Sequence, residues 1–286
     1  MRHLRRVWSF AVWVLCLTLS PAFANAPLSR SILILDDSAG AAAGPFYASV
    51  VLAVRNTVNR DPSNQFSIFV EHLDFHRFRG PEREVAVNTY FRAKYMDQSI
   101  GVIVVIGNGA LQYILRARQE LWPAVPVVFA FVDPLYLSGS EFPSGVTGVT
   151  SRLKFSDMLE AARAVVPDLN GVAVVGEPAH TLVPYRHFKD ELPAAAATGL
   201  SIIDLTGRPL REVQARVAQL PARTAITYLG MYLDGEGTYL TPVEALNRFT
   251  EFANRPIVVT AETQIGSGSM QLNLPVGLRE PTNAAN

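Results

Sequence analysis

Cysteine is almost absent from this sequence. Cys16 is the only one among 286 residues, and it lies in an apolar stretch near the N-terminus. A single thiol cannot form an intrachain disulfide bond, and a chain that loses this stretch has neither a thiol nucleophile nor a cysteine ligand for a metal. The preceding residues, Trp13-Val14-Leu15, do not form a lipoprotein cleavage box, so we do not expect a lipid anchor at Cys16.

An excess of charge of either sign is also lacking. Lys and Arg number 25, Asp and Glu number 25, and the formal net charge is zero. Beyond the N-terminus the sequence has no basic cluster with interleaved aromatic residues. Electrostatic attraction to nucleic acid or to anionic lipid is therefore not expected. Hydrophobic residues make up 49% of the chain, which is enough to bury a globular core.

Long apolar runs are missing after the N-terminal stretch. The longest ones, Val102–Ile106 and Val125–Val132, have the length of buried strands. A membrane-spanning helix needs ~20 apolar residues, so we expect none in this part of the chain.

The N-terminus has the pattern of a secretory signal. Three arginines precede an apolar stretch, Val7–Leu19, and two small-x-small sequences follow it, Ala22-Phe23-Ala24 and Ala24-Asn25-Ala26. This arrangement predicts a signal peptide over 1–26 that is cleaved on export, and a periplasmic location for the mature protein. The alternative interpretation is an uncleaved N-terminal anchor.

The remaining sequence alternates between short apolar runs and longer amphipathic ones. This alternation is typical of βαβ units and of a parallel sheet. The predicted strands are Ser31–Leu35, Phe66–Val70, Gly101–Ile106, Pro126–Val132, Gly171–Val175, Leu200–Leu205, Thr224–Leu229 and Pro256–Thr260. The predicted helices are Phe46–Asn59, Glu82–Tyr95, Ala110–Glu120, Phe155–Val165, Leu182–Leu192, Pro209–Gln219 and Pro242–Ala253.

A loop rich in Gly, Ser and Pro, Leu137–Gly148, interrupts this alternation. We place the boundary between two lobes just after it, near Thr150. The predicted organisation is an N-terminal α/β lobe over 27–149, a C-terminal α/β lobe over 150–262 and a polar tail over 263–286. The predicted fold class is α/β, with a parallel sheet in each lobe and a cleft between the lobes.

Polar residues and glycines follow most of the predicted strands directly. Ligands of open α/β sheets collect outside the carboxyl ends of the strands, and ordinary βα turns use the same residue types. Taken as a set, these residues predict the lining of a ligand cleft. The predicted ligand-binding residues are Asp37, Ser38, Asn108, Asp133, Glu177, Tyr228 and Glu262.

Several segments resemble recurring blocks of one known family. They are Glu71–Phe78 (EHLDFHRF), Tyr90–Tyr95 (YFRAKY), Gly107–Leu111, Glu120–Phe129 (ELWPAVPVVF) and Tyr228–Tyr239 (YLGMYLDGEGTY). Together they are similar to the ABC-transporter substrate-binding-protein-like family, which includes periplasmic sensor domains found ahead of bacterial histidine kinases. The resemblance covers most of Ser31 to Met270. It implies two Rossmann-like lobes of the periplasmic binding protein type that close by a hinge on a small ligand.

One departure from the family pattern concerns the C-terminal part. Related sequences continue after a turn like Gly266-Ser267-Gly268 with more glycine and a returning segment, whereas this chain passes through Met270-Gln271-Leu272 into a short polar tail. The sequence given holds no kinase module. The expected partners are a small-molecule ligand and either a membrane permease, for solute uptake, or a membrane histidine kinase, for sensing.

Enzyme chemistry has only scattered candidates. Glu71, His72, Asp74 and His76 form the best metal-like cluster, because imidazole and carboxylate bind zinc. On a strand, His72, Asp74 and His76 would share one face, but the predicted strand Phe66–Val70 ends just before them. His180 closely follows Glu177 and offers a possible base. An exported α/β hydrolase or a metal-dependent enzyme is therefore the alternative function.

The motifs that such enzymes need are nevertheless missing. Gly266-Ser267-Gly268-Ser269 is not a Gly-x-Ser-x-Gly elbow after a strand, and Gly107-Asn108-Gly109 lacks the Lys and Ser or Thr of a P-loop. The acidic turn Asp234-Gly235-Glu236-Gly237 does not have EF-hand spacing. We predict no catalytic residues, no metal and no cofactor.

Overall fold

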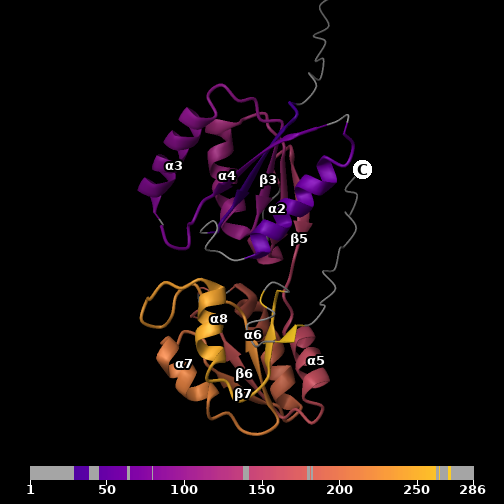
Figure 1. Ribbon diagram of the computed structural model, residues 1–286, viewed down its shortest axis with the longest axis vertical. Coiled ribbons are helices and arrows are strands. Elements are labelled where there is room, and N and C mark those ends of the chain that lie inside the picture. Colours follow the sequence, from indigo (N-terminus) through magenta and orange to yellow (C-terminus); the bar gives the residue numbers. More distant parts are fainter. Residues whose placement is uncertain are drawn as a thin grey trace, which may run out of the picture.

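The computed structural model describes residues 29–38, 45–62, 65–78, 80–137, 142–178, 181, 183–261, 264 and 270–271. The predicted signal segment 1–26 lies outside these residues, as do Glu262 and His180. Two α/β lobes are stacked along the long axis of the molecule (Figure 1). Among the described residues, no helix combines the length and the apolar character needed to cross a membrane.

The first lobe is built on a sheet of five parallel strands in the order β2-β1-β3-β4-β5. Their bounds are β1 Ser31–Asp36, β2 Ser67–His72, β3 Val102–Ile106, β4 Val127–Val132 and β5 Val146–Thr150. Helices α3 (Pro81–Lys94) and α4 (Asn108–Leu121) pack on the face that carries Leu33 and Leu35, and α2 (Pro45–Val58) packs on the face that carries Ile32 and Ile34. A short 3-10 helix, η2 (Pro134–Tyr136), follows β4.

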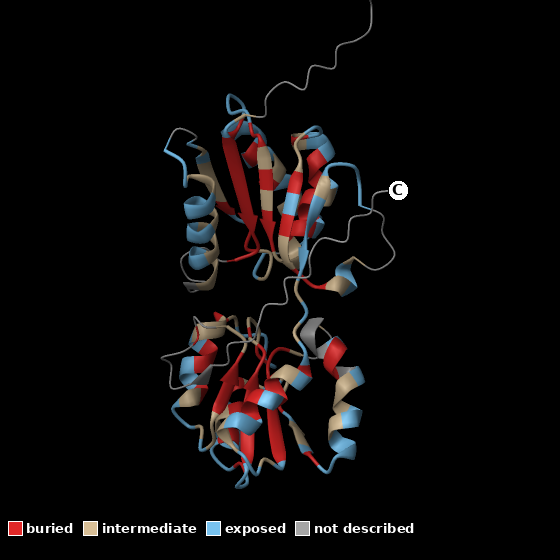
Figure 2. Cartoon of the chain, turned by 90° about the vertical axis from the view of Figure 1, so that its right-hand side faces the viewer, coloured by how far each residue is buried: buried red, intermediate tan, exposed pale blue. Residues whose placement is uncertain are grey.

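The second lobe repeats this plan with the strand order β10-β9-β8-β6-β7, again all parallel. The strands are β6 Gly171–Val175, β7 Ser201–Asp204, β8 Thr224–Tyr228, β9 Ile257–Val259 and β10 Met270–Gln271. Helices α5 (Phe155–Val165) and α6 (Val183–Ala197) cover one face. Helices α7 (Leu210–Val217) and α8 (Pro242–Thr250) cover the other. Figure 2 shows buried strands at the centre of both lobes.

Local sequence accounts for most of these elements. Strand β1 (SILILD) is buried along its whole length because helices cover both faces of the sheet. Helix α8 begins with a capping box, in which the Thr241 hydroxyl accepts from the Glu244 N–H and the Glu244 carboxylate accepts from the Thr241 N–H. Proline at the first helical position starts both α3 and α8.

The structure adds two edge strands that the sequence analysis did not predict. β5 lies within and just after the predicted loop Leu137–Gly148, and most of its residues are exposed. β10 falls within the predicted polar tail over 263–286 and pairs with β9. Both strands are short, and an edge strand needs no continuous apolar run because one side of it faces away from the sheet. Helix α6 also continues past Leu192, where we expected it to end, with Pro193 inside it.

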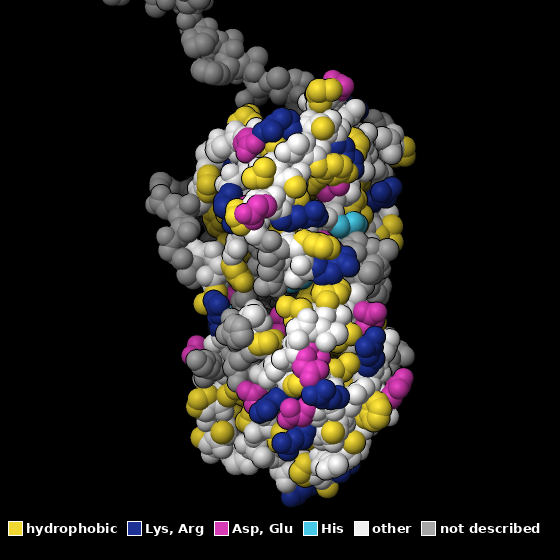
Figure 3. All heavy atoms as spheres, turned by 90° about the vertical axis from the view of Figure 1, so that its left-hand side faces the viewer, with side chains coloured by type: hydrophobic (Ala, Val, Ile, Leu, Met, Phe, Trp, Pro, Cys, Tyr) yellow, Lys and Arg dark blue, Asp and Glu magenta, His cyan; other side chains and the backbone are white. Residues whose placement is uncertain are grey.

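Charge is spread evenly over one face of the molecule. On the face shown in Figure 3, acidic and basic side chains alternate over both lobes without a large area of one sign. This distribution matches the balanced composition, and the face shown has no basic track for a nucleic acid.

Candidate ligand-binding cleft between the lobes

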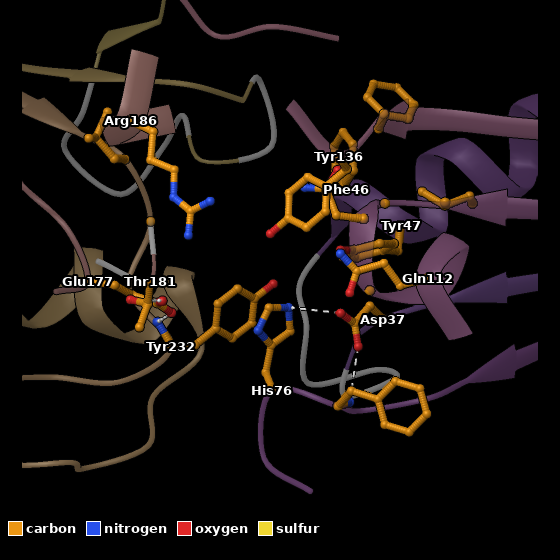
Figure 4. A pocket seen from close by; sticks show the side chains of 18 of the residues that line it. Asp37, Phe46, Tyr47, His76, Gln112, Tyr136, Glu177, Thr181, Arg186 and Tyr232 are labelled. Carbon is orange, nitrogen blue, oxygen red and sulfur yellow. Dashed lines mark hydrogen bonds and ion pairs between the residues drawn. The ribbon is translucent and has the colours of Figure 1, made fainter. Parts of the chain in front are cut away.

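A cleft of about 620 Å³ lies between the two lobes, at the carboxyl ends of their strands. Its walls combine aromatic rings with a few acidic, basic and amide side chains (Figure 4). The first lobe contributes Asp37, Phe46, Tyr47, His76, Asn108, Gln112 and Tyr136, among others. The second lobe contributes Glu177, Thr181, Arg186, Leu229, Gly230 and Tyr232.

Asp37 follows β1 and is the buried acid of the first lobe's wall. Its Oδ1 accepts from the Phe75 N–H at 3.0 Å, and its Oδ2 lies 3.5 Å from His76 Nε2. The N-terminal turn of α4 packs closely against it, because a Cβ on Gly109 would lie 1.9 Å from Asp37 Oδ2. Glycine at position 109 is therefore a condition for this placement of the carboxylate.

Asp36 and Ser38, on either side of Asp37, face into the lobe. The buried Asp36 carboxylate lies 2.9 Å from His72 Nδ1 and accepts the Ser38 hydroxyl, which is itself 3.2 Å from the same His72 nitrogen. The hydrogen bond to Asp36 raises the pKa of His72, and partial burial acts in the opposite direction. Ser38 thus braces the end of β1 behind the cleft.

Asn108 and Asp133 connect the ends of two neighbouring strands. Asn108 Oδ1 accepts from the Asp133 N–H at 2.8 Å, and the Asp133 carboxylate accepts from the Leu135 N–H at 2.9 Å. Gly107, which precedes α4, has a φ of 92°. That conformation suits glycine and turns the chain sharply from β3 into the helix.

Glu177 holds the corresponding loop of the second lobe. Its Oε1 accepts from the Tyr232 N–H at 2.8 Å, and its Oε2 accepts from the Thr181 hydroxyl at 3.2 Å. These bonds join the loop after β6 to the loop after β8 and bring Tyr232 to the cleft.

Several contacts between described residues cross from one lobe to the other. The rings of His76 and Tyr232 stack at 4.0 Å between centroids with only 2° between their planes. The Arg77 guanidinium lies 5.0 Å from the centroid of the Tyr239 ring. Deeper, His187 Nε2 on α6 lies 2.8 Å from Asp133 Oδ1, and both side chains are buried.

The tyrosine hydroxyls of the cleft stay neutral. Burial raises the pKa of Tyr47, and its neighbours Tyr232, Asp37 and Asp36 raise it further. Burial is also the largest cause that raises the pKa values of Tyr232 and Tyr136. These hydroxyls are therefore uncharged hydrogen-bond donors at neutral pH, and they add no negative charge to the cleft.

The structure places the seven predicted site residues differently. Asp37, Asn108 and Glu177 line the cleft. Ser38 lies behind it, and Asp133 forms the buried pair with His187. Tyr228 lies in the core of the second lobe, where its hydroxyl donates to the Pro242 carbonyl at 2.7 Å and its ring packs on Phe249. Glu262 lies outside the described residues.

Sequence reasoning missed several lining residues. His76, Arg186 and Tyr232 do not directly follow a strand, so the rule of strand ends does not select them. Phe46 and Tyr47 lie in the first turn of α2, where aromatic residues are commonly core residues. Only their position next to the loop after β1 could have indicated the cleft.

The four members of the metal-like cluster have separate partners. His72 contacts Asp36, His76 contacts Asp37, Asp74 binds Arg77, and Glu71 accepts from the Tyr95 hydroxyl. Within the described ranges, no group of three His, Cys, Asp or Glu side chains is arranged to hold a metal ion. Because β2 ends at His72, before Asp74 and His76, the three side chains do not share one face of a strand.

Comparison with known proteins gives the fold. No protein-family model matches the sequence, and no curated protein matches it. An ABC domain from Streptococcus pneumoniae in complex with L-Trp has a TM-score of 0.55 at 15% identity, over 85% of this chain and 79% of that one. A ligand-free, open substrate-binding protein with adhesive properties from Clostridium difficile has a TM-score of 0.53 at 14% identity, over 85% and 79%.

A trehalose repressor from Escherichia coli also matches, with a TM-score of 0.51 at 10% identity, over 84% of this chain and 85% of the repressor. Substrate-binding proteins and a repressor thus share the architecture, so likeness at these identities defines the fold and leaves the function to the site. The chain has the two-lobed α/β fold of periplasmic binding proteins.

Proposed function

We propose that this chain is an exported binding protein that holds a small molecule between its two lobes. The observation that carries the proposal is the cleft of about 620 Å³ at the carboxyl ends of both parallel sheets. Its volume lies within the ~300–1,000 Å³ of small-molecule sites, and its walls mix aromatic rings with a few placed polar groups. A ligand there would contact both lobes at once and favour their closure.

Export to the periplasm is the second part of the proposal. It rests on the basic, apolar and small-residue pattern of residues 1–26. In that compartment the protein would deliver its ligand to a membrane permease or report its presence to a membrane histidine kinase. Cell fractionation with and without residues 1–26 tests this part, because a protein that stays in the cytoplasm in both cases would contradict it.

Among the described residues, Asp36, His72 and Ser38 resemble a catalytic triad in composition, but their geometry favours binding over catalysis. Asp36 and Ser38 both contact the same nitrogen of His72, Nδ1. A general base must instead bond its orienting carboxylate through one ring nitrogen and the nucleophile through the other. The Ser38 hydroxyl also donates to Asp36, so it braces a loop and is not prepared for attack.

A thermal-shift screen of the purified chain tests the binding function. Because the Streptococcus pneumoniae structure is a complex with L-Trp, the panel begins with L-tryptophan and continues through other amino acids, aromatic acids, nucleosides, short peptides and sugars. A ligand at 100 times its Kd stabilises the folded state by about 2.7 kcal/mol. In a chain of this size that is a rise in Tm of roughly 5–10 °C.

A matched pair of variants locates the site. Phe46→Ala removes an aromatic wall of the cleft, and we expect it to weaken binding. Phe252→Ala removes an exposed ring of the second lobe, and we expect it to leave binding unchanged. A panel without any dose-dependent shift, or equal effects of both variants, would contradict the proposed function.

A further inference from the structure

The charged side chains of the cleft differ in one respect, namely whether the protein already supplies their partners. Nearly all of them have a hydrogen bond or an ion pair within the described chain. These are Asp37 with His76 and the Phe75 N–H, Glu84 with Arg116, and Glu177 with Thr181 and the Tyr232 N–H. A ligand therefore meets an electrostatic environment in which most charges are already compensated.

Arg186 is the exception. It lies in the first turns of α6, its side chain is exposed, and it has no hydrogen bond or ion pair within the described part of the chain. Figure 4 shows its guanidinium turned toward the cavity, opposite the side chains of the first lobe. A guanidinium offers five N–H donors in a planar fork that fits a carboxylate through two parallel hydrogen bonds.

The wall that faces Arg186 is aromatic. Tyr136, in η2, and Phe46, in α2, line the cleft from the first lobe (Figure 4). Arg186 acts electrostatically on the Tyr136 hydroxyl, which places the two side chains in the same part of the cavity. An apolar or aromatic group held against this wall would carry its substituent toward the guanidinium.

We propose that Arg186 is the specificity-determining residue of the cleft and binds the carboxylate of a small ligand whose apolar body lies against Phe46 and Tyr136. This inference rests on the proposed function and names the ligand class of the same site. A neutral ligand would leave the guanidinium without a partner in a cavity that loses water on closure, and a cationic group would be repelled by it. A phosphate dianion fits less well than a carboxylate, because the buried carboxylates of Asp37 and Glu177 line the same cavity and repel two negative charges more strongly than one.

Ligand pairs in which a neutral carboxamide replaces the carboxylate test this assignment. Isothermal titration compares indole-3-acetate with indole-3-acetamide, phenylacetate with phenylacetamide, benzoate with benzamide, and L-tryptophan with L-tryptophanamide. We expect the acid of at least one pair to bind at least tenfold more tightly than its amide. We also expect its affinity to fall as ionic strength rises, because salt screens exposed charges.

Variants of the chain assign the preference to one side chain. Arg186→Gln should weaken binding of the acid by about 10–100-fold and remove the preference for acid over amide, since a charged hydrogen bond contributes about twice as much as a neutral one. Arg186→Lys should keep part of the preference, because it retains the charge without the planar fork. Arg163→Gln, which changes an exposed arginine in the last turn of α5, is the control and should bind like the parent chain.

The outcomes separate this inference from the function on which it rests. Binding of a neutral or cationic compound that is insensitive to Arg186→Gln would preserve the binding function and overturn the role of Arg186. Binding of acids with equal affinity by the parent chain and Arg186→Gln would also overturn it. Failure of every compound in this set and in the wider screen would contradict the proposed function itself.

Discussion

The buried pair of Asp133 and His187 joins the two lobes, and its removal should destabilise the protein measurably. His187 Nε2 lies 2.8 Å and 2.9 Å from the two carboxylate oxygens, and each side chain is only 8% exposed. A hydrogen bond to a charged group at such a site contributes about 1.5–3 kcal/mol. His187→Leu should therefore lower Tm by roughly 3–12 °C, at about 2–4 °C per kcal/mol for a chain of this size.

A double-mutant cycle measures the interaction itself. The variants are His187→Leu, Asp133→Asn and the combination, each unfolded thermally in the absence of ligand. Asparagine keeps an oxygen that can accept from the Leu135 N–H, as Asp133 does, so its main effect is on the pair. We expect the double variant to lose about 1–2 kcal/mol less than the sum of the single losses.

The exposed ion pair of Arg152 and Glu191 is the matched control. These side chains are 41% and 23% exposed, and exposed pairs couple by only about 0.2–1 kcal/mol. If the losses at Asp133 and His187 add to within about 0.5 kcal/mol, or couple no more strongly than the control pair, the two side chains act independently. The argument that they hold the lobes together would then be wrong.

Three further predictions concern single residues. His72→Gln should remove a pH dependence of the stability, because Asp36 raises the pKa of His72 in the folded state. The stabilisation of the folded state by protonated His72 is complete below its unfolded pKa of about 6.5 and is lost as pH rises through the folded pKa. Measurement of Tm against pH for the parent chain and the variant tests this. Gly109→Ala should displace Asp37, whose Oδ2 would lie 1.9 Å from the new Cβ. We expect a loss of about 1–3 kcal/mol in stability, seen as a Tm lower by several degrees, and a weaker ligand affinity in titration. Asp234→Ala should destabilise the second lobe by about 2–4 kcal/mol in urea unfolding, because this buried carboxylate accepts from the N–H groups of Leu210, Glu236 and Thr238; an unchanged midpoint would refute that role.

The fold follows from the sequence where burial leaves a continuous pattern. The predicted elements Phe155–Val165 and Gly171–Val175 coincide with α5 and β6, because both carry apolar residues that pack into one core. β5 gives no such signal: its sequence, VTGVT, is mostly exposed and contains Gly148, where a Cβ would lie 2.2 Å from the Phe129 carbonyl oxygen. Its pairing with β4 comes from the tertiary structure rather than from local preference.

The site is harder to predict from the sequence than the fold, because its residues come from chain segments that lie far apart in the sequence. The rule of strand ends selects Asp37, Asn108 and Glu177, which line the cleft. It also selects Tyr228, although the last side chain of a strand can point either out of the sheet's end or into a core, and this one packs on Phe249. The stack of His76 on Tyr232 depends on how the lobes face each other, and no local pattern contains that information.

Polar residues at the strand ends therefore have three different structural roles, although all of them act through hydrogen bonds. Ser38 braces a loop within its own lobe, Asp133 reaches the other lobe through His187, and Asp37 lines the cavity while its own lobe holds it. What separates these tasks is the partner that the rest of the protein supplies. A charged side chain that is already paired positions the walls, whereas one without a partner favours a ligand that provides it. Among the charged side chains of the cleft that the structure describes, Arg186 has no hydrogen bond or ion pair with another described residue, which is why we assign its partner to the ligand.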